Sequence, residues 1–140
     1  MAPVYKMLNL PISYIAIHAS LSPNDRVVTA ADIHEWHLEN DWSGIGYHAV
    51  IQRNGKIERG RPHFWKGAHI LGHNLHTLGI CLIGTDEFTD EQLFSLKELI
   101  LEWLDLYPLA EVVGHRDLDS NRTCPNFDAR HWWQTGEVRP

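Results

Sequence analysis

Basic residues are too few in this sequence to form a surface that binds nucleic acid. Twelve Lys and Arg stand against 18 Asp and Glu, so the formal net charge is -6 at pH 7. Binding to a phosphate backbone needs clustered positive charge, and the sequence has no run of Lys and Arg that would supply it. We therefore expect no nucleic-acid partner.

Long apolar segments are also absent. No apolar run approaches the roughly 18 residues that a membrane-spanning helix needs. The amino-terminal segment, MAPVYKMLNLPISYIAIH, has one Lys and two prolines in place of the charged and apolar regions of a secretory signal. We therefore expect no membrane insertion and a protein that its own sequence leaves in the cytoplasm where it is made.

Only two cysteines occur, so at most one disulfide could form. Cys81 lies in the apolar run GICLIG, which is typical of a buried strand, and a packed thiol accounts for it. Without an export signal, a disulfide between Cys81 and Cys124 is not favoured. Histidine, by contrast, occurs ten times, which is more than a core of this size requires. Chemistry is therefore expected among the histidines.

The chain has the size and composition of one globular domain, residues 1–140. The apolar fraction of 44% is enough for a core, and 10% aromatic and 21% charged residues do not indicate disorder. Expected strands alternate with expected helices, which predicts an α/β domain with a central mixed sheet flanked by helices. The strands are expected at Tyr14–Ile17, Tyr47–Gln52, Lys56–Glu58, Gly79–Thr85 and Val112–Gly114.

Two helices have clear start signals. Thr29 and Asp32 form a capping-box pattern at the start of a helix that extends to Glu39. Thr89 and Gln92 form a second one, which begins a long amphipathic helix that Pro108 ends. A short closing helix is expected over Phe127–Gln134, with Trp132 and Trp133 packed on the sheet.

Two histidines are expected to have structural roles. His37 shares a helix face with Ile33, which predicts a core-facing ring bonded to backbone. Alternation along the Tyr47–Gln52 strand places Tyr47, Ala49 and Ile51 on one face and His48 on the other. We therefore interpret His48 as a structural residue.

Two histidines and a cysteine follow the ends of expected buried strands. His18 comes after Tyr14–Ile17, His115 after Val112–Gly114, and Cys124 on the polar loop beyond it. Imidazole and thiolate both bind zinc, and catalytic zinc usually has three protein ligands and one position for water. Spacing alone leaves the zinc site open, since loops that mix His and Cys are not rare. A Cys124 nucleophile with His115 as its base is the competing interpretation.

A series of short motifs extends from Tyr14 to Asp128. They are IAIHAS, GIGYHAVI, IERGRP, GAHILGHN, LGICLIGT, GHRD and CPNFD, in that order. In type and order they resemble the type 2 N-acetylmuramoyl-L-alanine amidases, a family that includes small phage endolysins and the peptidoglycan recognition proteins. The resemblance covers nearly the whole chain and implies the fold of that family.

The resemblance also implies a site. It gives zinc-binding roles to His18, His115 and Cys124, and a catalytic role to Tyr47. Arg122 occupies a position where the family's enzymes usually have a lysine that assists catalysis. Arginine keeps the positive charge but does not release its proton near neutral pH. Arg122 therefore suits stabilisation of an oxyanion better than proton donation.

The substrate groove of the family maps onto the GAHILGHN loop. His69 and Asn74 lie where the family lines its groove, and we expect them to contact substrate. Trp65 and Trp42 could stack on a sugar or peptide, although ordinary partly buried aromatic residues would explain both tryptophans equally well.

The implied reaction is hydrolysis of the amide between the lactyl group of N-acetylmuramic acid and L-alanine. The substrate would be peptidoglycan or a muropeptide, and the enzyme a monomer. The length of the chain and the lack of a signal or wall-binding module indicate a phage or prophage endolysin that acts at the host cell wall. The alternatives are a non-catalytic peptidoglycan-binding module and a cytoplasmic muropeptide-recycling amidase. Because the chain keeps the expected ligands, we rank catalysis first.

Overall fold

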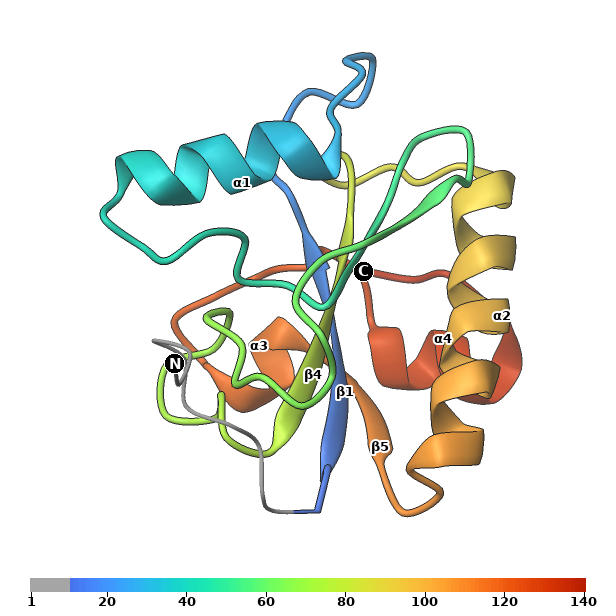
Figure 1. Ribbon diagram of the computed structural model, residues 1–140. Helices are drawn as coiled ribbons and strands as arrows, with labels where there is room; N and C mark the ends of the chain where they lie inside the picture. The colour runs from blue at the N-terminus through green and yellow to red at the C-terminus, as the bar shows by residue number, and fades with distance from the viewer. Residues whose placement is uncertain (1–10) are drawn as a thin grey trace.

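The computed structural model describes residues 11–140 and contains one five-stranded sheet (Figure 1). The strands are β1 (Tyr14–Ala19), β2 (Ala49–Ile51), β3 (Ile57–Arg59), β4 (Thr77–Leu82) and β5 (Glu111–Gly114), in the order β3-β2-β4-β1-β5. Strands β2, β4, β1 and β5 run parallel, and β3 pairs antiparallel with β2. The mixed sheet predicted from the sequence is confirmed. Residues 1–10, which include most of the segment tested for a secretory signal, lie outside the described part.

The helices are α1 (Ala30–Glu39), α2 (Asp90–Leu106), α3 (His115–Leu118) and α4 (Ala129–Thr135). Both predicted capping boxes are present: Thr29 and Thr89 each exchange two hydrogen bonds with the residue three positions later. The single turn of α3 was not predicted, because four residues are too short for a periodic pattern. None of the helices in residues 11–140 is both long and apolar enough to cross a membrane.

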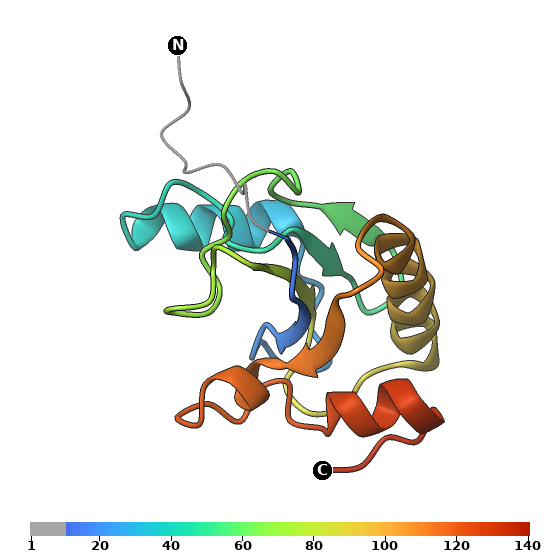
Figure 2. The same ribbon diagram turned by 90° about the horizontal axis from the view of Figure 1, so that it is seen from below.

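One face of the sheet carries the main apolar core. Large aliphatic side chains occupy alternate positions of the central strands, and α2 and α4 pack on them (Figures 1 and 2). Trp103 of α2 and Trp132 of α4 are buried in this core, and Trp133 packs against it, as predicted. Burial of each large aliphatic side chain contributes about 1.5 to 3 kcal/mol to stability, so the packing on this face stabilises the sheet.

The opposite face has small or polar side chains at the alternate positions. Ala16 and His18 lie on it in β1, and Thr77, Gly79 and Cys81 lie on it in β4. Helix α1 and the loop between β3 and β4 lie on this side of the sheet (Figures 1 and 2). Because the strand residues here are small, side chains from the loop can reach the sheet, and the candidate site forms there.

The structure corrects two strand boundaries near the site. β1 continues to Ala19, so His18 lies within the strand and not beyond its end. β2 begins only at Ala49, and the carbonyl of Tyr47 accepts a hydrogen bond from the Arg61 N–H. Tyr47 packs with Val50 and Cys81, so the prediction that it shares a face with Ala49 was wrong. Strand alternation applies only inside a strand, and Tyr47 precedes this one.

Candidate metal centre

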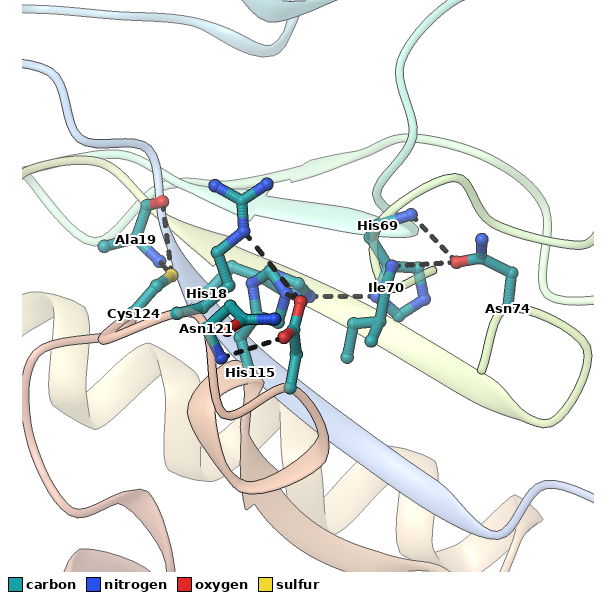
Figure 3. A network of polar contacts seen from close by, with 10 residues as sticks. His18, Ala19, His69, Ile70, Asn74, His115, Asn121 and Cys124 are labelled. Carbon is teal, nitrogen blue, oxygen red and sulfur yellow. Dashed lines mark hydrogen bonds and ion pairs between the residues drawn. The ribbon is translucent and has the colours of Figure 1, made fainter. Parts of the chain in front are cut away.

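The three predicted metal ligands converge at the carboxyl ends of two neighbouring strands. Ile17 of β1 is paired with Gly114 of β5, so His18, the next residue of β1, lies beside His115, which follows the end of β5. Their ring centroids are 4.5 Å apart. One ligand atom each from His18, His115 and Cys124 lies within 4.8 Å of the other two (Figure 3). The geometry therefore brings together residues that are up to 106 positions apart by sequence number, 18 to 124.

Backbone contacts hold the Cys124 loop against the strand ends. The Cys124 carbonyl accepts a hydrogen bond of 2.8 Å from the Arg116 N–H, and its sulfur accepts one of 2.9 Å from the Ala19 N–H. Gly114 allows the return of the loop, because a Cβ at that position would lie 2.8 Å from the Cδ of Pro125. The thiol is thereby fixed beside the two imidazoles.

The chemistry of this donor set fits a borderline-soft divalent ion such as zinc. Burial lowers the pKa of His18 and of His115, so both imidazoles are held in the neutral form that binds metal. Burial raises the pKa of the Cys124 thiol to about 11, while the Ala19 N–H and Arg122 act in the opposite direction. Burial thus opposes a free nucleophilic thiolate, which needs a lowered pKa, whereas a bound zinc ion would itself favour loss of the thiol proton.

The second nitrogen of each histidine faces a further side chain. The Nε2 of His18 is 2.9 Å from the Nδ1 of His69, and the Nε2 of His115 is 3.9 Å from a carboxylate oxygen of Asp119. Asp119 was not singled out from the sequence. A carboxylate four residues after a ligand, within one helical turn, is the signal that would have found it.

The two predicted catalytic residues both lie near the ligands. The Tyr47 ring is 5.0 Å from the His18 ring, and burial raises the pKa of its phenol well above 10, so it remains a neutral hydrogen-bond donor. The side chain of Arg122 is 65% exposed, with its Nε 3.9 Å from Asp119. An exposed guanidinium beside the ligands can reach a bound substrate.

A hollow of about 300 Å³ opens beside the metal centre. It is lined by Trp42, Ala68, His69, Ile70, Leu71, Asn74, His115, Asp119 and Arg122. Of the predicted groove residues, His69 and Asn74 are therefore placed here. The Asn74 side-chain oxygen accepts hydrogen bonds of 2.9 Å from the N–H groups of His69 and Ile70, so it also shapes the loop. Trp42 is 45% exposed, and its ring packs against that of His37 in a tilted arrangement at 4.4 Å.

Trp65 is separated from this group. It lines a different hollow of about 420 Å³, formed with residues of α1, of the loop that follows α1 and of the segment after β3. The sequence grouped Trp65 with the expected groove residues His69 and Asn74, which lie in the same loop region. Trp65 does not line the hollow beside the metal centre, and its contact with substrate stays a prediction.

Both histidines that were given structural roles bond to backbone, which the sequence had predicted for His37. The Nδ1 of His37 accepts a hydrogen bond from the Gly46 N–H. The Nδ1 of His48 accepts one from the Gly79 N–H, and its Nε2 donates one of 2.9 Å to the Trp65 carbonyl. His48 therefore ties β4 to the loop that covers this face.

A His-His-Cys group at the carboxyl ends of parallel strands, beside an open polar hollow, is typical of a metal-dependent hydrolase. Comparison with known proteins identifies the class. A model of the N-acetylmuramoyl-L-alanine amidase family matches residues 8–127. The endolysin of Enterobacteria phage K11 is 33% identical over 134 residues, which cover 90% of this chain and 88% of that protein. This chain belongs to the N-acetylmuramoyl-L-alanine amidase family and is an enzyme of that class.

Other relatives agree. The endolysin of Escherichia phage T7 is 33% identical over 132 residues, covering 89% of this chain and 87% of its own. The solved structure of the amidase LysC from Clostridium intestinale superposes with a TM-score of 0.78 at 30% identity, covering 89% of this chain and 85% of that one. The solved structure of a Drosophila PGRP-LB mutant in complex with tracheal cytotoxin superposes with a TM-score of 0.81 at 26% identity, covering 94% of this chain and 85% of that one. The amidase fold expected from the sequence motifs is confirmed.

Proposed function

We propose that this chain is a zinc-dependent amidase that hydrolyses the bond between the lactyl group of N-acetylmuramic acid and L-alanine in peptidoglycan. The observation that supports this most is the convergence of His18, His115 and Cys124 within 4.8 Å beside an open hollow. Three protein ligands are the number that catalytic zinc sites use.

Different residues of this chain would have different roles in the proposed hydrolysis. Zn²⁺ held by the three ligands would supply Lewis acidity and a bound water with a pKa lowered to about 7. Tyr47, as a neutral phenol, and Arg122, as a permanent cation, are suited to stabilise the negative charge that develops on the scissile carbonyl oxygen. The hollow lined by His69, Asn74 and Trp42 would receive the muropeptide.

The relatives support a proposal for the biological setting. The proteins from phages K11 and T7 are endolysins, and each matches this chain over nearly its whole length. We propose that this chain, as a single-domain monomer, degrades the cell wall of a phage host. A muropeptide-recycling amidase would use the same site on soluble fragments, and a binding module would hold the wall without cleaving it.

Digestion of purified peptidoglycan tests these functions together. The protein is assayed as isolated, after treatment with a chelator, and after return of Zn²⁺, and products are identified by mass spectrometry. We expect loss with chelator, recovery with zinc, and products that end in free L-alanine amines. Cleavage of soluble muropeptides but not of intact wall would favour the recycling enzyme. Retention on the wall without cleavage under any condition would favour the binding module.

A further inference from the structure

Three side chains behind the metal centre form a continuous chain of hydrogen bonds. The Thr77 hydroxyl lies 2.7 Å from the carbonyl oxygen of His73 and 3.1 Å from the Nε2 of His69. The Nδ1 of His69 lies 2.9 Å from the Nε2 of His18 (Figure 3). This series of hydrogen bonds therefore begins at the backbone carbonyl of His73 and ends at His18, one of the three predicted metal ligands.

The first bond determines the direction of the others. A carbonyl oxygen only accepts, so the single hydroxyl proton of Thr77 goes to His73. The Thr77 oxygen must then accept from His69, which places the proton of the neutral His69 ring on Nε2 and leaves Nδ1 as an acceptor. The Nε2 of His18 consequently donates to His69, and the lone pair of His18 is on Nδ1.

Packing fixes the His69 ring in this orientation. The ring lies against Gly79 of β4, where an added Cβ would be 2.8 Å from Nδ1, and against Gly67, where an added Cβ would collide with Cδ2. The rings of His69 and His48 meet edge to face at 5.8 Å. The side chains bonded to or stacked on the ring, His18, Thr77 and His48, bring no negative charge that would favour an imidazolium.

We propose that His69 and Thr77 are positioning residues that orient His18 and hold it in the tautomer whose Nδ1 binds the metal. The proposal rests on the proposed zinc site. It adds that two further residues set the orientation and the tautomer of one zinc ligand, His18. It also changes the expected role of His69. A groove residue would act on substrate, whereas a positioning residue acts on metal affinity in the absence of substrate.

The test compares two pairs of variants. His69→Leu removes the acceptor, while His69→Asn offers an amide oxygen near the position of Nδ1. Thr77→Val removes the hydroxyl at nearly constant shape, while Thr77→Ser keeps it. Zinc affinity is measured by competition with a chromophoric chelator, and ¹⁵N NMR reports the histidine tautomers of the metal-free protein. Far-UV circular dichroism and thermal melting confirm that each variant folds.

We expect the zinc affinity of folded His69→Leu to fall by about 10- to 100-fold, the usual effect of removing a group that supports a metal ligand. His69→Asn and Thr77→Ser should retain more affinity than the other member of each pair. The NMR spectrum of the wild type should show His18 and His69 both protonated on Nε2. Unchanged affinity in folded His69→Leu, or His69 protonated on Nδ1, would overturn the proposal while the zinc amidase stands. A wild type that binds no zinc would overturn both.

Discussion

The sulfur of Cys124 accepts a hydrogen bond of 2.9 Å from the backbone N–H of Ala19, the residue that follows His18 (Figure 3). The two residues are 105 positions apart in sequence. This contact couples the position of the cysteine to the strand that carries the first histidine. A thiolate would gain from the same N–H, because a hydrogen bond to the charged form of a group favours that form.

Replacing Cys124 with serine should remove zinc binding and amide cleavage and leave the fold largely intact. A hydroxyl is a harder and much less acidic ligand than a thiol, so it does not substitute for thiolate on zinc. Metal content of the purified variant, loss of turbidity of a cell-wall suspension, and circular dichroism measure the three effects. If Cys124→Ser keeps wild-type activity, the ligand assignment is incorrect.

Two variants of Arg122 test whether activity depends on its positive charge or on the shape of its guanidinium group. We expect Arg122→Lys to keep or raise activity, since lysine preserves the cation. Arg122→Met, which keeps the length but not the charge, should reduce kcat by about 10²-fold, at the lower end of the effect of losing an oxyanion donor. Steady-state kinetics on a soluble muropeptide measures both variants. A collapse of activity in Arg122→Lys would show that the planar guanidinium itself is needed.

Tyr47→Phe should reduce kcat by about 10²-fold while zinc content and stability stay close to wild type, because only a hydroxyl is lost. Burial raises the pKa of this phenol well above 10, so the wild-type enzyme should show no loss of activity from tyrosine ionisation up to pH 9. The pH profiles of the two proteins, recorded with saturating zinc, provide the measurement. A Tyr47→Phe enzyme of normal activity would limit Tyr47 to packing against His18.

His48→Leu should destabilise the fold, because it leaves the Gly79 N–H and the Trp65 carbonyl without their bonds. Each unsatisfied buried group costs about 1 to 3 kcal/mol. Urea unfolding at pH 7, with chelator present, measures this loss in the metal-free protein. An unfolding free energy equal to that of wild type would contradict the structural role of His48.

The same residue predicts a dependence on pH. Burial lowers the pKa of His48 from 6.5 to about 4. Between pH 4 and pH 6.5 the His48 of the unfolded chain binds more protons than that of the folded chain. The contribution of neutral His48 to the free energy of unfolding is therefore complete above pH 6.5. It is lost as the pH falls toward 4, by about 3 kcal/mol in all. The stability difference between wild type and His48→Leu should therefore shrink as the pH is lowered. A constant difference would mean that His48 does not titrate in this window.

Much of the fold could be predicted from local signals. The capping boxes at Thr29 and Thr89 depend only on neighbouring residues, and the apolar runs of β1, β4 and β5 reflect burial on both faces. The prediction for Tyr47 was wrong because the start of β2 depends on hydrogen bonds to a distant segment.

The site was only partly visible in the sequence. The three ligands could be found because His18 and His115 lie near the carboxyl ends of apolar strands and the motifs around all three resemble a known family. The contacts that support the ligands could not be found from the sequence. The hydrogen bond between His69 and His18 joins residues 51 positions apart, and it depends on the path of a loop. Trp65 shows the same limit, as its position near the GAH motif did not bring it into the hollow.

The central claim is that His18, His115 and Cys124 bind one zinc ion and leave a coordination position facing the hollow. Diffraction at the zinc absorption edge from crystals of the zinc-loaded protein tests it most directly. The predicted result is one anomalous peak, about 2.0 to 2.1 Å from a nitrogen of each histidine and about 2.3 Å from the sulfur of Cys124. A peak at other residues, or a fourth protein atom that closes the coordination sphere, would contradict it.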